Sequence, residues 1–272
     1  MHYTPHTASA PGKLFVFGEY AVLACAPCVV LSVGRRVVAS AHATPQPAYV
    51  TRGAALAEDT RLPDMALTEL NDARSAAWFS TDVSALYDGD IKLGLGSSAA
   101  SMAALMLAAK RLPADELFAH AWRAHRALQS GRGSGADVAA SCYGGVLGYQ
   151  LLEPQAPFPQ LDLPPMKHSR DVGGVAGIRD GLSFPDDLTL HAVWLGAPAT
   201  STELIRRVEQ ALQTNPEATR DALQRVAVVA DDALHAMGTG DSAALLRAFG
   251  EGEGAMRALG VAAGVVADVL SQ

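Results

Sequence analysis

Apolar positions recur with two different spacings, which divide the chain into a first part that mixes strands and helices and a last part that is nearly all helical. Runs of β-branched and aromatic residues predict strands, expected at 14–17, 29–33, 36–42, 91–93, 146–151 and 188–195. The last of these needs a neighbour, because one strand cannot satisfy its own backbone groups. The segment 177–184 is a candidate partner, and further strands are expected.

Apolar residues spaced three and four apart predict the helices. Met102, Leu105, Met106 and Ala109 form one apolar face of a helix over 97–110. Further helices are predicted at 113–128, 136–143, 200–212, 216–238 and from 241 toward 250. Thr200 with Glu203 reads as a capping box, and Asn215 before Pro216 as a helix start. The mixture of elements predicts an α+β fold.

The composition restricts the kind of protein and its partners. The chain has 272 residues, of which 49% are hydrophobic, enough for one large domain or two ordinary ones. A net charge of −7 argues against nucleic acid as the main partner. No secretory signal and no membrane span is recognisable, and Cys25, Cys28 and Cys142 suit a reducing compartment. These features predict a cytoplasmic protein without a membrane partner.

A glycine loop carries the clearest chemical signal. Gly94-Leu95-Gly96 follows a short predicted strand, and Ser97-Ser98-Ala99 opens a helix. Free amides at a helix N-terminus hold phosphate, and glycines let the backbone approach it closely. A serine hydroxyl there can also bind Mg²⁺, and we favour Ser98 over Ser97 for this role. The alternative is a turn with an ordinary serine cap.

Two charged residues are candidates for chemistry beside such a loop. Lys13 follows Gly12, and an ammonium group there can stabilise transferring phosphoryl charge. Asp137 follows Gly133-Ser134-Gly135 at a helix start, where a carboxylate can help hold Mg²⁺ or orient an acceptor. The alternatives are a surface lysine and an acid that stabilises the helix dipole.

Residues 10–23, APGKLFVFGEYAVL, resemble the first motif of the GHMP kinase superfamily, and residues 93–100, LGLGSSAA, resemble its second. Segments 92–100, 133–145 and 194–202, with Tyr20 after Glu19, are similar to the phosphomevalonate kinase branch. The resemblance implies a ribosomal S5 domain 2-like N-terminal ATP-binding domain at 1–185. It also implies a ferredoxin-like C-terminal domain at 186–272.

The resemblance further implies an ATP- and Mg²⁺-dependent kinase that acts on a small molecule, 5-phosphomevalonate, as a monomer or homodimer. Lys13 and Asp137 would be catalytic, and Ser98 would bind the metal. Nucleotide contacts are expected at Gly94, Leu95, Gly96, Ser97, Ser98 and Ala99. Substrate contacts are expected at Lys13, Glu19, Tyr20, Ser134, Gly135 and Ser201. Basic candidates for the substrate's phosphate or carboxylate are Arg35, Arg36, Lys92 and Arg132.

Two departures from the family pattern keep alternatives open. Arg126 stands where mevalonate kinases carry a Mg²⁺-binding glutamate, and the family's third, glycine-rich motif is absent. The C-terminal domain is therefore expected to be truncated. The alternatives are a mevalonate kinase, another GHMP small-molecule kinase, or a non-catalytic homologue that binds a nucleotide or metabolite. His125 and Gln129 face the glycine loop by helical spacing, and His125 is expected to be structural.

Overall fold

The computed structural model describes residues 6–43, 49–53, 61–70, 77–194 and 201–261. The chain divides into two compact units. The first combines Met1–Leu14 with Val30–Gly145, and the second combines Phe15–Val29 with Val146–Gln272. The predicted α+β class is confirmed, because both units contain strands and helices. The predicted domain boundary at residue 185 stays a prediction.

The strands of the first unit pair around β2. β1 (His6–Phe17) and β4 (Ala77–Asp82) both pair with β2 (Pro27–Ala43), and β3 (Tyr49–Arg52) runs parallel to β4. In β2 the side chains of Val37, Ala39 and Ala41 are buried. This alternation is typical of a strand with one face against a core. A small hairpin of β5 (Tyr87–Asp88) and β6 (Ile91–Lys92), preceded by the 3₁₀ turn η2 (Ser84–Leu86), leads into the glycine loop.

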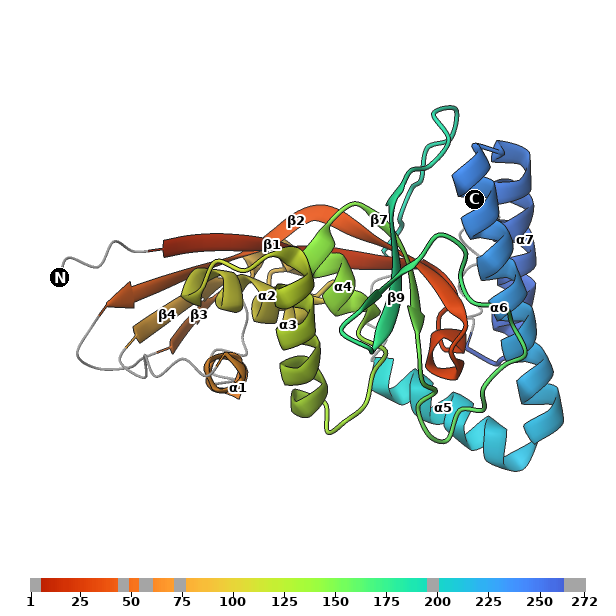
Figure 1. The fold of residues 1–272 in the computed structure, drawn as a ribbon, viewed down its shortest axis with the longest axis horizontal. Coiled ribbons are helices and arrows are strands. Elements are labelled where there is room, and N and C mark those ends of the chain that lie inside the picture. The colour runs from red at the N-terminus through yellow and green to blue at the C-terminus, as the bar shows by residue number, and fades with distance from the viewer. Residues whose placement is uncertain (1–5, 44–48, 54–60, 71–76, 195–200, 262–272) are drawn as a thin grey trace. The chain divides into compact units, whose positions relative to one another are not determined.

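Among its described residues, this unit also contains the helices α1 (Arg61–Glu69), α2 (Ser97–Ala109), α3 (Ala114–Leu128) and α4 (Ala136–Tyr143). α2 packs against the other three (Figure 1). The prediction of one buried face on α2 was too narrow, since Ala99, Ala103 and Ala104 are fully buried as well. Alanine has a small side chain, so neighbouring elements can pack on several sides of this helix.

The second unit has an antiparallel sheet and a helical layer. β9 (Ala176–Leu182) pairs with β7 (Val146–Leu151) and with β8 (Arg170–Val172). Its helices are η1 (Ala21–Ala24), α5 (Ser201–Thr214), α6 (Pro216–Thr239) and α7 (Ser242–Ala258). α6 and α7 lie side by side (Figure 1), and the rings of Phe17 and Phe249 pack with centroids 4.6 Å apart. No helix of the described residues is both long and apolar enough to cross a membrane.

The strand predicted at 188–195 is wrong for residues 188–194, which form no regular secondary structure. The suggested partner segment does contain a strand, β9, but it pairs with β7 and β8. Leu190, Val193 and Trp194 are exposed in consequence. A strand needs a neighbour for its backbone groups, and the described residues offer this segment none. Thr200 of the predicted capping box lies outside the described residues.

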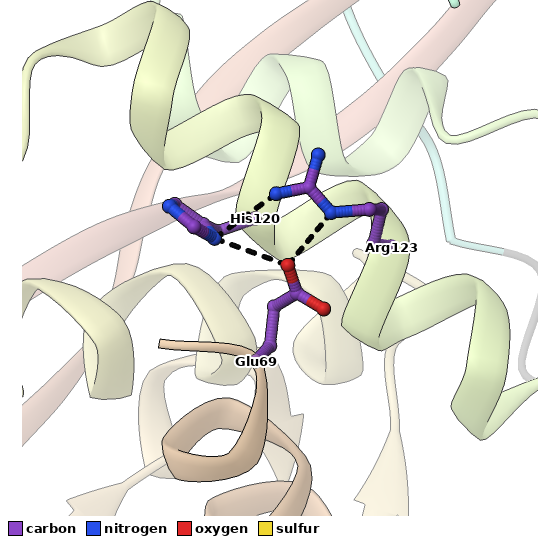
Figure 2. A network of polar contacts seen from close by, with 3 residues as sticks. All are labelled: Glu69, His120 and Arg123. Atoms are coloured by element: carbon purple, nitrogen blue, oxygen red, sulfur yellow. Dashed lines mark hydrogen bonds and ion pairs between the residues drawn. The ribbon is translucent and has the colours of Figure 1, made fainter. Parts of the chain in front are cut away.

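A polar cluster joins α1 to α3 within the first unit. One carboxylate oxygen of Glu69 accepts from Arg123 Nε at 2.7 Å and lies 3.1 Å from His120 Nδ1 (Figure 2). The side chain of Glu69 is 24% exposed. A half-buried carboxylate with two partners contributes more to stability than an exposed ion pair, which is worth little. The cluster therefore fixes the end of α1 against α3.

Replacing Glu69 by Ala should lower the free energy of unfolding by about 1 kcal/mol, because Arg123 Nε loses its acceptor and His120 loses its contact with the carboxylate. Urea denaturation followed by circular dichroism measures the change. The matched control is Glu203→Ala, which breaks the exposed i,i+4 pair of Glu203 with Arg207 on α5. That change should cost less than about 0.5 kcal/mol. Equal effects in the two variants would contradict the structural role of the cluster.

Candidate functional site

The glycine loop has the backbone geometry of an anion site. Gly94 and Gly96 both have positive φ, +77° and +74°, and Gly96 is the N-cap of α2. No side chain caps the helix there, so its first amides are not satisfied by a cap. A Cβ built at Gly94 would meet no atom within 4 Å. The loop is therefore open beside Gly94, where an anion could approach the backbone.

Lys13 is held directly against this loop. Its backbone N–H donates to the carbonyl oxygen of Leu95 at 2.8 Å. Its side chain runs across the start of α2, since a Cβ built at Gly96 would lie 2.8 Å from Lys13 Cγ. β1 and the loop approach so closely that a Cβ built at Gly12 would lie 2.6 Å from the Leu95 oxygen. The positively charged side chain of Lys13 and the N-terminus of α2 are far apart in sequence, but they lie next to each other in the structure.

α4 is tied to the same stretch of β1. The Ser141 hydroxyl donates to the carbonyl of Pro11 at 2.9 Å, across 130 residues of sequence. Asp137 lies four residues before Ser141, so it shares that helix face one turn nearer the N-terminus. Its side chain is half-buried, and one oxygen accepts from the Val138 N–H at 2.9 Å. Asp137 thus stabilises the first turn of α4 and lies on the face that approaches the segment containing Lys13.

The loop before α4 is fixed by its own hydrogen bonds. The Ser134 hydroxyl accepts from the Ala136 N–H at 3.3 Å, and Trp122 Nε1 donates to the Ser134 carbonyl at 3.4 Å. Gly135, with φ +79°, is the N-cap of α4. The guanidinium of Arg126 lies over the Trp122 ring, 5.1 Å from its centroid. This arginine, the departure noted in the sequence, therefore stacks beside the loop through a cation–π contact.

Sequence reasoning missed one contact of the glycine loop. His125 on α3 is only 2% exposed, and its Nε2 lies 3.2 Å from the hydroxyl oxygen of Ser98. Helical spacing had indicated that His125 faces this loop. Helical spacing does not identify Ser98 as the partner of His125, because this pairing depends on how α3 packs against α2. Ser97 is buried and Ser98 half-buried, so Ser98 is the more accessible of the two hydroxyls.

Three predicted substrate contacts belong to the second unit. Glu19 and Tyr20 follow Gly18, whose φ is +84°. A Cβ built at Gly18 would lie 2.5 Å from the Pro27 carbonyl oxygen. Burial, with the Glu19 carboxylate adding to it, raises the pKa of Tyr20 far above its ordinary value. Tyr20 is therefore a neutral phenol throughout the physiological range. Ser201 begins α5, and its side chain lies outside the described residues. These three residues thus belong to the unit that does not contain the glycine loop, and their role as substrate contacts stays a prediction.

Two of the basic candidates hold the fold together. Arg35 donates to the Ala85 carbonyl at 3.0 Å, and Arg36 donates to both the hydroxyl and the carbonyl of Ser9. Lys92 on β6 and Arg132 before α4 are exposed. Arg35 and Arg36 are exposed as well, so accessibility does not distinguish the four candidates.

The oxygen donors near the glycine loop suit a metal ion that binds together with phosphate. The described residues hold no group of three or more His, Cys, Asp or Glu side chains that could hold a metal ion. Mg²⁺ typically keeps several waters and binds through one or two protein oxygens together with substrate phosphates. The Ser98 hydroxyl and the Asp137 carboxylate are oxygen donors of this kind. The first unit therefore fits Mg²⁺ that is bound as a nucleotide complex.

Comparisons with known proteins agree with this geometry. Residues 66–145 match the family model described as the GHMP kinases N terminal domain, which contains the glycine loop and α4. A mevalonate kinase of Aeropyrum pernix is 25% identical over an alignment that covers 93% of this chain and 76% of that protein. A phosphomevalonate kinase of a Streptomyces species is 29% identical over an alignment that covers 87% of this chain and 74% of that protein.

A solved structure of a phosphomevalonate kinase has a similar fold. The structure of Streptococcus pneumoniae phosphomevalonate kinase in complex with phosphomevalonate and AMPPNP superposes with a TM-score of 0.69. The two sequences are 16% identical, and the match covers 93% of this chain and 80% of that one. The resemblance predicted from the sequence is thus confirmed: residues 66–145 match the GHMP kinase N-terminal domain, and the chain is similar to a mevalonate kinase and to phosphomevalonate kinases.

The contact between Gly12 and the loop can be tested with two glycines of the first unit. Gly12→Ala would place a methyl group against the Leu95 backbone and should lower the free energy of unfolding by about 1–3 kcal/mol. Gly34→Ala on β2 is the matched control, because a Cβ there meets nothing within 4 Å. It should leave stability within about 0.5 kcal/mol. Thermal denaturation of both variants measures the difference, and a harmless Gly12→Ala would contradict the close packing.

Proposed function

For a chain similar to the mevalonate and phosphomevalonate kinases, we propose transfer of the γ-phosphoryl group of ATP to 5-phosphomevalonate. An oxygen of the acceptor phosphate forms the new bond to the γ-phosphorus. The bond from that phosphorus to the β–γ bridging oxygen breaks, and the electron pair leaves with ADP. The products are 5-diphosphomevalonate and ADP. The observation that carries the proposal is the position of Lys13 against the uncapped start of α2.

The glycine loop binds the triphosphate of ATP in this proposal. Residues Gly94, Leu95, Gly96, Ser97, Ser98 and Ala99 supply the backbone of the loop and the first turn of α2. Free amides and the positive end of the helix dipole both attract phosphate oxygens. The local field matters here because the whole chain carries a net charge of −7. A helix N-terminus with a lysine across it makes this site positive in an acidic protein.

Lys13 stabilises the charge that develops during transfer. Donor and acceptor are both anions, so their approach is opposed by electrostatic repulsion. An ammonium group between them lowers that repulsion and is most effective where negative charge accumulates in the transition state. The backbone hydrogen bond to Leu95 holds Lys13 at the loop before substrates arrive. Little reorganisation is then needed in the transfer step.

Asp137 and Ser98 supply the oxygen donors for Mg²⁺, which neutralises phosphate charge when it is bound with ATP. Asp137 also orients the acceptor. A phosphate acceptor is already ionised near neutral pH, so a strong general base is less necessary than for an alcohol acceptor. Asp137 therefore acts by electrostatics and orientation. Ser134 and Gly135, directly before α4, together with Glu19, Tyr20 and Ser201, are the proposed substrate contacts.

The two domains of the proposal are an ATP-binding domain at residues 1–185 and a C-terminal domain at 186–272. The acceptor has one rival, mevalonate, which the 25% identity to the Aeropyrum pernix enzyme favours. The motifs at 133–145 and 194–202 and the 29% identity to the Streptomyces enzyme favour 5-phosphomevalonate.

An assay that couples ADP release to NADH oxidation distinguishes these acceptors. Purified protein with ATP and Mg²⁺ should release ADP with 5-phosphomevalonate and not with mevalonate. Turnover of mevalonate alone would assign the other kinase activity. ATP binding in a calorimeter without ADP release at high enzyme concentration would instead indicate a non-catalytic homologue.

The role of Lys13 can be measured in the same assay. Lys13→Met should lower kcat by about 10²–10³-fold, because it removes one preorganised cation from the transition state. Lys110→Met is the matched control, since Lys110 is an exposed lysine at the opposite end of α2. It should change kcat by less than about twofold. A Lys13→Met enzyme with normal kcat would remove the central element of the proposal.

A further inference from the structure

His125 is a buried polar side chain that contacts the proposed nucleotide site. It lies on α3, is 2% exposed, and has its Nε2 3.2 Å from the Ser98 hydroxyl oxygen. Burial of a polar group is unfavourable unless it is hydrogen-bonded, and Ser98 provides that bond. The contact joins residues 27 positions apart in sequence, so it reflects the packing of α3 on α2.

Ser98 is the residue whose hydroxyl orientation matters at this helix start. Gly96 provides no side-chain cap, Ser97 is buried, and Ser98 is half-buried in the first turn of α2. A serine hydroxyl rotates freely about its C–O bond and has one proton and two acceptor lone pairs. Its value as a metal ligand depends on where that proton points. A fixed acceptor for the proton would direct the oxygen lone pairs toward the open side of the loop.

We propose that His125 is a positioning residue that orients the Ser98 hydroxyl toward the Mg²⁺ of the bound nucleotide complex. In this arrangement the imidazole carries its proton on Nδ1, and Nε2 accepts a hydrogen bond from the Ser98 hydroxyl. The lone pairs of the Ser98 oxygen are then directed at the metal. This inference rests on the proposed ATP- and Mg²⁺-dependent function. His125 itself touches neither substrate nor metal and acts through Ser98.

The opposite hydrogen-bond direction makes a different prediction. If Nε2–H donated to Ser98, the hydroxyl proton would point outward, toward a phosphate oxygen. His125 would then support binding of ATP with or without Mg²⁺. Acceptance by Nε2 instead confines its effect to the contribution of Mg²⁺. Comparing the ATP affinity of the His125 variants with and without Mg²⁺ therefore shows which of the two residues, His125 or Ser98, donates the hydrogen bond.

Two amide variants separate positioning from packing. The side-chain amide of Gln reaches the place of the imidazole Nε2, whereas that of Asn reaches only the place of Nδ1. Both are polar and smaller than histidine, so they disturb the packing of α3 in a similar way. His125→Gln should retain the contact with Ser98, and His125→Asn should lose it. Thermal denaturation of both proteins checks that they are folded to a similar extent.

The experiment is calorimetric titration of wild type, His125→Gln, His125→Asn and Ser98→Ala with ATP, in Mg²⁺ and in EDTA. Wild type and His125→Gln should gain affinity on adding Mg²⁺. In His125→Asn and Ser98→Ala this gain should fall by roughly three- to tenfold, with affinity in EDTA unchanged. His125→Asn combined with Ser98→Ala should be no weaker than Ser98→Ala alone, because both changes remove one interaction.

Three results would overturn the inference. His125→Gln and His125→Asn could behave alike, the two changes could add in the double variant, or the loss could appear equally in EDTA. In the kinase assay, a positioning role predicts a raised KM for the ATP complex in His125→Asn, with an unchanged KM for the acceptor. A wild-type protein that binds ATP and Mg²⁺ but phosphorylates neither acceptor would refute the proposed function alone. A wild-type protein that binds no ATP would overturn both.

Discussion

The hydrogen bond from the Lys13 N–H to the Leu95 carbonyl is the constraint on which the candidate site depends. It joins the first strand to the loop before α2, and Gly12 makes the approach possible because it has no Cβ. The same bond brings a cation to the positive end of a helix. Neither group alone would distinguish this site from an ordinary turn or a surface lysine. The proposed phosphate site, and the proposed role of Lys13 in transfer, both depend on their juxtaposition.

α2 shows how the fold holds this site in place. The helix is rich in alanine and is buried on several sides by α1, α3 and α4, so its start has little freedom to move. A second bond, from Ser141 to Pro11, ties α4 to the stretch of β1 that contains Lys13. The bond between His125 and Ser98 ties α3 to the first turn of α2. Long-range polar contacts thus fix a site whose chemistry needs few side chains.

Most helices could be predicted from local pattern alone. The predicted helix at 136–143 and strand at 146–151 agree with α4 (Ala136–Tyr143) and β7 (Val146–Leu151). Glycines on both sides of α4 explain this, because they end elements sharply whatever the surroundings. The strand predicted at 188–195 failed for its described residues, because strands form only with a neighbour. Residues from Leu188 to Trp194 alternate between apolar and polar in the sequence, but this alternation does not reveal whether a neighbouring strand exists.

The candidate site divides in the same way between sequence and tertiary structure. The sequence by itself determined the glycine loop, the helix that follows it, and the presence of Lys13 and Asp137, because backbone geometry and helix starts are local properties. Only the tertiary structure decided that Lys13 meets Gly96, that Ser141 reaches Pro11, and that His125 reaches Ser98. These pairs lie 27 to 130 residues apart, and their contact depends on the path of the whole chain.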